Sequence, residues 1–158
     1  MILYLLRHAD ARTEAVSDEE RQISQKGISQ AKRVAKFCAS NELLPGIILT
    51  SPIRRAQETA ELFSVETNVK RVLALGFLKS GMTSEQALEG LAEYAEFESV
   101  MIVGHEPDFS ELVAALLGLS DRERVRLRKA SLTAIEISEV KAGRGVLQFS
   151  IPVKLMPR

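Results

Sequence analysis

Short apolar runs alternate with longer amphipathic stretches along the chain. The run Ile2–Leu6 ends sharply at Arg7-His8, and runs that are apolar on both faces are typical of buried strands in a parallel sheet. The expected strands cover residues 2–6, 47–50, 69–75 and 99–103. The intervening stretches carry apolar residues at helical spacing. The expected helices run from a cap at Ser24 through Cys38, from Ser51-Pro52 to about Phe63, and from Ser84 to Phe97. A fourth helix follows Gly104-His105-Glu106-Pro107, carries Phe109 and Leu112 on its apolar face, and stops at Gly118.

The order of these elements predicts the fold class. Strands that alternate with helices imply an α/β fold, here a three-layer α/β/α sandwich with a mostly parallel central sheet. Residues 132–137 and 146–153 are predicted to form a C-terminal hairpin at a sheet edge, and the polar residues 9–23 a long loop. Because no linker, repeat or low-complexity segment interrupts the pattern, residues 1–158 are expected to form a single domain.

Composition and charge exclude several classes of function. Lys plus Arg equals Asp plus Glu at 21 each, so the formal net charge is zero. Domains that bind polyanions are usually basic, which argues against nucleic acid as a partner. Any anion site must therefore be a local concentration of arginine. The short apolar run at the N-terminus is neither a signal peptide nor a membrane span, which predicts a soluble, cytoplasmic protein with no membrane partner. Cys38, the single cysteine, allows no internal disulfide and is expected to be a small buried hydrophobe.

Three segments leave the ends of predicted strands with chemically reactive or charged residues. They are Leu6-Arg7-His8-Ala9, Thr50-Ser51-Pro52-Ile53-Arg54-Arg55-Ala56 and Val103-Gly104-His105-Glu106-Pro107. Ligands of open α/β sheets bind beyond the carboxyl ends of the strands. Both histidines of the chain occupy such positions, so a site at this edge is expected to contain both.

The second of these segments places cations at the start of a helix. With Ser51 as N-cap and Pro52 as first helical residue, Arg54 and Arg55 fall in the opening turn. Cations there oppose the helix dipole, at a cost of about 0.3–1 kcal/mol each. An anion bound at the helix start would reverse this penalty. Partial neutralisation by Glu58 or Glu61 is the alternative reading.

These residues together suggest phosphoryl chemistry. Neutral imidazole is a competent nucleophile, and arginines stabilise the oxygens of a transferring phosphoryl group. His8 would attack, Arg7 and Arg55 would bind the oxygens, and His105 could donate to them if protonated. A bound dianion would raise the pKa of His105 and the arginines would lower it, so its charge stays open.

The motifs resemble those of the histidine phosphatase superfamily, and most of all its small SixA-type phosphohistidine phosphatases. The matching segments are residues 6–11, 51–60 and 103–107, with a weaker match over residues 18–27. The resemblance implies a phosphoglycerate mutase-like fold, His8 as the phosphorylated nucleophile, and a phosphate pocket of Arg7, Arg55 and His105. It also implies that Arg21 projects over this pocket, although Gln22 and Ile23 replace the usual Pro-Leu beside it. Ala9 stands where the larger family has glycine.

A departure from the family pattern bears on the substrate. Many relatives carry a glutamate after the third strand as general acid, whereas residues 75–81 here contain no carboxylate. The remaining candidate acids are Asp10, Asp18, Glu20 and Glu106. Imidazole leaves a phosphorus atom with less help than an alkoxide does, so the missing acid favours phosphohistidine or an activated ester. The short chain also suggests an open site without a large lid, which would admit phosphohistidine on a partner protein.

Other functions remain as alternatives. The same pocket could serve a small-metabolite phosphomonoesterase, a mutase, or a module that binds phosphate or a phosphoprotein without turnover. The short chain and absent acid disfavour the mutase. A metal site is disfavoured because two histidines without a cysteine pair fall short of the ligands that zinc requires, so no metal or cofactor is expected. The basic stretch over residues 121–129 is interpreted as a solvated face, with docking of an acidic protein as the alternative.

Overall fold

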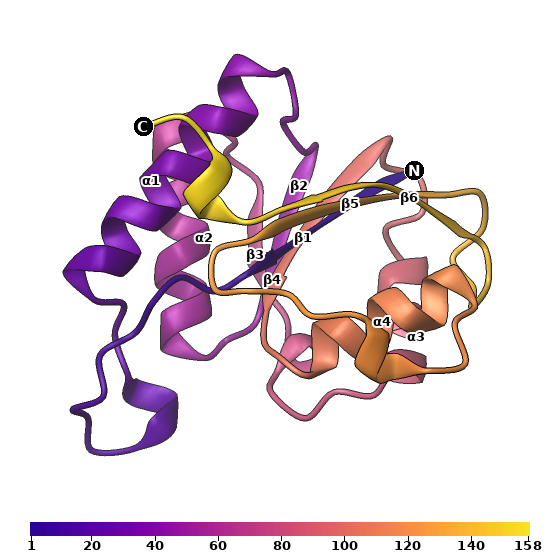
Figure 1. Ribbon diagram of the computed structural model, residues 1–158, viewed down its shortest axis with the longest axis horizontal. Helices are drawn as coiled ribbons and strands as arrows, with labels where there is room; N and C mark the ends of the chain where they lie inside the picture. Colours follow the sequence, from indigo (N-terminus) through magenta and orange to yellow (C-terminus); the bar gives the residue numbers. More distant parts are fainter.

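A six-stranded sheet forms the centre of the computed structural model, which describes residues 1–158 apart from the side chain of Arg122 (Figure 1). The strands are β1 (Ile2–Arg7), β2 (Ile47–Thr50), β3 (Val72–Ala74), β4 (Ser99–Gly104), β5 (Leu132–Ile137) and β6 (Gly145–Ile151). They lie in the order β3-β2-β4-β1-β5-β6. The first four are parallel, while β5 runs antiparallel to β1 and β6 antiparallel to β5. The predicted mostly parallel sheet with a C-terminal edge hairpin is confirmed.

Helices cover both faces of this sheet and make the three predicted layers (Figure 1). One face packs against α1 (Gln25–Ser40) and α2 (Arg54–Thr67), and the other against α3 (Ser84–Ala92) and α4 (Asp108–Leu117). Successive side chains of a strand point to opposite faces. Tyr4 and Leu6 of β1 therefore join the core under α1 and α2, while Leu3 and Leu5 join the core under α3 and α4. Complete burial of one such leucine contributes about 1.5–3 kcal/mol to stability.

Several element boundaries differ from the sequence prediction, and three of them have a clear local reason. β3 covers only residues 72–74, because it is an edge strand with Leu73 and Ala74 exposed. α3 ends at Ala92, since the chain from Ala92 to Phe97 tightens into successive i→i+3 turns. α2 continues past Phe63 to Thr67 and ends at Asn68, whose φ of 62° is left-handed.

The loop between β1 and α1 is anchored at both ends and carries a 3₁₀ turn, η1 (Asp18–Glu20), at its tip. Ala11 pairs with Ile23 in an isolated antiparallel bridge. Ser24 caps α1 as predicted, accepting from the backbone N–H of Gly27 at 3.0 Å. A Cβ on Gly27 would lie 2.1 Å from the carbonyl oxygen of Asp10, so only glycine permits this close approach of helix to loop.

Cys38 is fully buried, which agrees with its predicted role as a small hydrophobe. Burial raises the pKa of its thiol to about 12. Within the part of the chain that the structure describes, every helix is too short or too polar to cross a membrane.

Candidate active site

Two neighbouring parallel strands end with the two histidines. Arg7 at the end of β1 lies opposite Gly104 at the end of β4, and the backbone N–H of His8 donates to the Gly104 carbonyl at 3.0 Å. The ring centroids of His8 and His105 are 5.4 Å apart. β2 flanks β4 on its other side, and Ser51 follows directly from it. The three predicted segments therefore meet at one edge of the sheet.

His8 is held as a neutral imidazole with a defined tautomer. Its Nδ1 lies 2.8 Å from the carbonyl oxygen of Ala9, which can only accept, so Nδ1 carries the hydrogen and Nε2 is left with its lone pair. The Nε–H of Arg55 donates to that Nε2 at 3.3 Å. Burial lowers the pKa of His8 to about 3, against a smaller upward effect of the bond to Ala9. Its Nε2 is therefore unprotonated at neutral pH, and its lone pair can attack an electrophile when the Arg55 hydrogen bond gives way.

α2 begins two residues later than predicted, because Ser51 serves another partner. The N-cap is Ile53 rather than Ser51, and the helix starts at Arg54 rather than at Pro52. The Ser51 hydroxyl oxygen accepts from the Ile53 N–H at 3.1 Å and lies 2.8 Å from Nε2 of His105. The assignment of Ser51 as helix cap was wrong.

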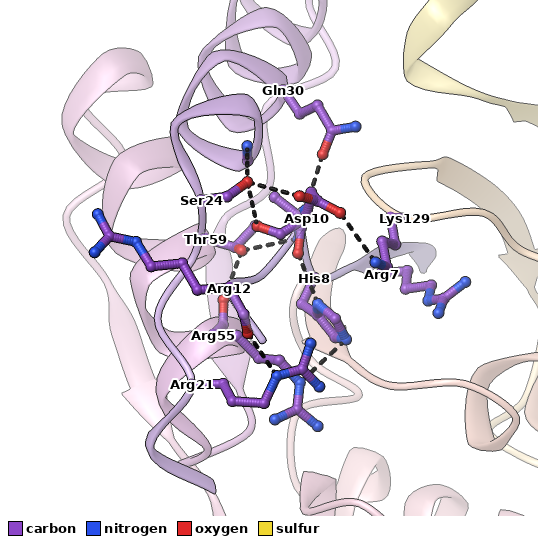
Figure 2. Close-up of polar contacts among 12 residues, drawn as sticks. Arg7, His8, Asp10, Arg12, Arg21, Ser24, Gln30, Arg55, Thr59 and Lys129 are labelled. Atoms are coloured by element: carbon purple, nitrogen blue, oxygen red, sulfur yellow. Dashed lines mark hydrogen bonds and ion pairs between the residues drawn. The ribbon is translucent and has the colours of Figure 1, made fainter. Parts of the chain in front are cut away.

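The two arginines at the start of α2 have different surroundings. Arg54 donates to the carboxylate of Glu58 at 2.9 Å on the surface, so neutralisation by Glu58 holds for this arginine. Arg55 is 6% exposed and turns toward His8 (Figure 2). Its two terminal nitrogens bond to Asp18, one to the backbone carbonyl at 2.9 Å and the other to the carboxylate at 3.2 Å.

Thr59 ties this helix to the loop that follows β1. Its hydroxyl donates to the carbonyl of Arg55 at 2.7 Å and accepts from the backbone N–H of Ala9 at 3.1 Å (Figure 2). The positions of His8 and Arg55 are thereby coupled through one buried side chain.

Arg21 contacts the loop around the site and Asp18. Its Nε–H donates to the Arg12 carbonyl at 2.7 Å, and a terminal nitrogen pairs with the Asp18 carboxylate at 3.1 Å. Asp18 thus bridges Arg21 and Arg55, and these bonds, above all that from Arg21, lower the pKa of Asp18. The family resemblance implied that Arg21 projects over the pocket, and in the structure Arg21 is connected to Arg55 through Asp18.

The site is also more closed than its short chain suggested. His8, Arg55 and His105 are only 6%, 6% and 2% exposed. Part of the cover is η1, which places the Asp18 carboxylate on the Arg55 guanidinium. A carboxylate at this position demonstrates that Arg55 can hold an anion there.

Two side-chain nitrogen atoms of the site are buried and have no partner among the described residues. They are Nε of Arg7, whose terminal nitrogen donates to the Leu127 carbonyl at 2.9 Å, and Nδ1 of His105. The Ser51 hydroxyl can donate to Nε2 of His105 while it accepts from Ile53, and in that arrangement the ring hydrogen lies on Nδ1. Burial lowers the pKa of His105 to about 4, with Arg55 and Arg7 acting in the same direction. Buried donors without partners mark a place where an anion would complete the hydrogen bonding.

The carboxylates near the site are engaged with other groups. Asp10 accepts from Ser24 and Lys129, and these bonds lower its pKa. Glu106 accepts from the N–H and hydroxyl of Ser110, and Glu20 is exposed. Asp108 has its pKa raised by burial, but it accepts from the Gly81 N–H at 2.8 Å and fixes that loop. Among the described residues no group of three or more His, Cys, Asp and Glu is arranged to hold a metal ion.

Three contacts of the site were not predicted from the sequence. They are those of Ser51 with His105, of Thr59 with Ala9 and Arg55, and of Asp18 with Arg55. Thr59 carried a usable signal, since a threonine four residues after Arg55 can bond back to its carbonyl in a helix. The other two contacts join segments far apart in sequence, so local patterns do not reveal them.

The lowered pKa values predict how stability depends on pH. An unfolded histidine titrates near pH 6.5, while His8 and His105 titrate at about 3 and about 4 in the folded chain. The unfolded state therefore binds more protons below pH 6.5, so their contribution to stability is complete above that pH and is lost as the pH falls toward 4.

We expect nitrogen NMR to find both rings neutral at about pH 5, each with its hydrogen on Nδ1. Midpoints near pH 6.5 would contradict this geometry.

The sequence of this region matches a known family. Residues 3–75 match the family model of the histidine phosphatase superfamily (branch 1). The chain belongs to the histidine phosphatase superfamily. A protein of Picosynechococcus, itself uncharacterized, is 30% identical over 139 residues, which cover 85% of this chain and 84% of that protein. An uncharacterized chloroplastic protein of Arabidopsis thaliana is 28% identical over 130 residues, which cover 75% of this chain and 60% of that longer protein.

Solved structures show the same fold as this superfamily member. The protein histidine phosphatase SixA complexed with tungstate superposes with a TM-score of 0.88 at 22% identity, covering 98% of each chain. The α-ribazole phosphatase from Shigella flexneri superposes with a TM-score of 0.74 at 19% identity, covering 94% of this chain and 96% of that one. The predicted phosphoglycerate mutase-like fold is confirmed.

Proposed function

We propose that this chain is a phosphatase that transfers a phosphoryl group to Nε2 of His8 and then to water. The observation that carries the proposal is the buried, neutral His8, whose unprotonated Nε2 faces the Arg55 guanidinium. The unpaired donors of Arg7 and His105 support it, because they are available to phosphoryl oxygens.

The proposed reaction has two displacements. In the first, the lone pair on Nε2 attacks phosphorus, the bond from phosphorus to the leaving group breaks, and its electron pair leaves with that group. Arg7, Arg55 and His105 donate to the phosphoryl oxygens, where positioned charge and hydrogen bonds are the main source of catalysis. The Nδ1–H bond to the Ala9 carbonyl stabilises the positive charge that the ring gains. In the second, water attacks phosphorus, the P–N bond breaks with its electron pair returning to Nε2, and both hydrogens of the water leave with the phosphate as H₂PO₄⁻.

Phosphohistidine is the substrate that this site favours. The nearby Asp10 and Asp18 carboxylates have lowered pKa values, so neither holds a proton to donate at neutral pH. A substrate whose leaving group needs little protonation suits such a site, and imidazole is one. The structural likeness to a protein histidine phosphatase agrees with this choice.

A small phosphorylated metabolite is the second candidate, favoured by how deeply His8 and His105 are buried. We would separate the two by measuring phosphate release from a phosphohistidine protein, p-nitrophenyl phosphate and a sugar phosphate, without added metal. Faster release from phosphohistidine than from the sugar phosphate is expected. Preference for the sugar phosphate would assign the site to small metabolites and require an acid among the carboxylates. Binding of all three without turnover would identify a phosphate-binding module.

Ser51 is expected to act as a positioning residue for His105. Without its hydroxyl, the hydrogen of His105 can occupy either ring nitrogen, so Ser51→Ala should lower kcat by about five- to tenfold, the value of one hydrogen bond. Nitrogen NMR should detect a loss of the Nδ1–H tautomer of His105. Ser131→Ala is the matched control, because this buried hydroxyl has no partner among the described residues. An unchanged tautomer in Ser51→Ala would contradict the assignment.

A further inference from the structure

Helix α1 concentrates positive charge in a chain whose net charge is zero. It carries four cations and no carboxylate: Lys26, Lys32, Arg33 and Lys36. Residues 84–98, on α3 and the turns after it, carry five glutamates and no cation. α1 and α3 lie on opposite faces of the sheet (Figure 1), so these two helical segments place opposite charges on opposite sides of it.

A groove runs along the charged side of α1, between this helix and the C-terminal segment. Its volume is about 720 Å³, and Ile28 and Val153 contribute apolar surface to it. Six cations line it: Lys26, Lys32, Arg33, Lys36, Lys154 and Arg158. Arg33 holds the segment against α1 by donating to the carbonyls of Met156 at 2.7 Å and Lys154 at 3.1 Å.

The charge of this groove is mostly uncompensated. Where the structure describes side chains, Lys32 with Glu66, at 3.5 Å, is the only ion pair that the six cations make. In the stretch 121–129, Lys129 pairs with Asp10 and Arg124 with Asp121, while Arg126 and Arg128 are exposed and make no ion pair with any described side chain. The groove gathers more unpaired cations than that stretch does, and it places them around an apolar floor.

The groove begins beside the candidate active site. Ser24, which caps α1, donates to the Asp10 carboxylate at 2.7 Å, and the side-chain carbonyl of Gln30 accepts from the Asp10 N–H at 2.8 Å (Figure 2). Asp10 follows His8 by two residues. A chain segment lying along α1 would therefore extend away from the site that receives the phosphoryl group.

We propose that this groove docks an acidic segment of the protein that carries the phosphohistidine. The inference rests on the proposed function and adds to it a protein substrate with carboxylates near the phosphorylated residue. Opposite charge at a docking surface steers approach and fixes orientation, and the glutamates on the α3 face would repel an acidic partner that approached the wrong side. That acidic face and the zero net charge disfavour nucleic acid as the occupant.

The test compares two synthetic peptides that each carry one phosphohistidine. One has a tail of glutamates, and the other has a Gly-Ser tail of the same length. For the unaltered protein, kcat/KM should be about tenfold higher for the acidic peptide at low salt, and the ratio should fall as salt is added. Lys36→Glu with Lys154→Glu should bring the ratio close to one. Lys141→Glu with Arg144→Glu, two exposed cations of the β5–β6 turn, is the matched control and should keep the ratio.

Each result decides the proposal. A ratio near one in the unaltered protein, or a ratio that survives Lys36→Glu with Lys154→Glu, would overturn it while leaving the phosphatase intact. If neither peptide is hydrolysed, the proposed function fails, and fluorescence anisotropy of the unphosphorylated acidic peptide still tests docking. Binding that weakens at least about tenfold in the double variant supports the groove, and equal binding rejects it. Tighter binding of a single-stranded oligonucleotide than of the acidic peptide would replace the proposal with a nucleic-acid site.

Discussion

Replacing His8 by alanine is expected to reduce phosphatase turnover by about 10⁴-fold or more, since the nucleophile is lost and no other group in the site can replace it. His105 is not expected to substitute, because with Ser51 donating to its Nε2 the other ring nitrogen, Nδ1, carries the hydrogen and has no lone pair for attack. The measurement is phosphate release from phosphohistidine under single-turnover conditions. His8→Gln, which keeps a polar side chain of similar size, should be equally inactive and controls for the cavity left by alanine.

The His8→Ala variant also separates catalysis from phosphate binding. The donors of Arg7, Arg55 and His105 remain in His8→Ala, so phosphate or tungstate should still bind, which calorimetry can measure. Turnover above a trace in a folded His8→Ala protein would eliminate the proposed mechanism. Unchanged binding in a protein that never showed turnover would instead favour the binding module.

Removal of Arg55 is expected to have the second largest effect. Arg55→Ala deletes a donor aimed at the position of the phosphoryl oxygens, and loss of such a donor typically costs about 3–4 kcal/mol of transition-state stabilisation, or roughly 10²–10³ in kcat/KM. Arg55→Lys should not restore the rate, because an ammonium cannot bond to His8 and to an oxyanion with the geometry of a planar guanidinium.

The neighbouring arginine provides a matched control for this prediction. Arg54→Ala removes a cation from the same helical turn, but its partner is the surface carboxylate of Glu58, a pair worth about 0.3–0.5 kcal/mol. Its kcat/KM should therefore stay within about twofold of the unaltered protein. A near-normal rate for Arg55→Ala would transfer the phosphate-binding role to Arg54 or Arg21.

Most of the fold could be predicted from the sequence, because the elements that were predicted best are buried and their burial requires recognisable apolar residues. β1 and β4 are apolar on both faces and are buried on both, so their runs were recognisable without other information. β3 and α3 were predicted too long because their ends are exposed, and exposed ends obey local turn geometry more than hydrophobic pattern.

Some residues of the candidate site could likewise be predicted from the sequence, and others could not. His8, Arg55 and His105 could be placed together from sequence, since the ends of parallel strands meet at one edge of a sheet. The contact of Asp18 with Arg55 joins residues 37 apart and depends on how a long loop folds back. Ser51 looked like a helix cap because serine before proline is common there, and only the position of His105 shows its other partner. Tertiary contacts of this kind leave no periodic signal in the chain.

The central claim is that His8 carries the phosphoryl group during turnover. We would mix the protein with phosphohistidine substrate, quench rapidly with base, in which phosphohistidine survives, and locate the phosphoryl group by tandem mass spectrometry. The account predicts a phosphoryl group on His8 that forms and decays at rates compatible with turnover and is absent from His8→Ala. Turnover with no phosphorylated His8, or with the label on His105, would contradict it.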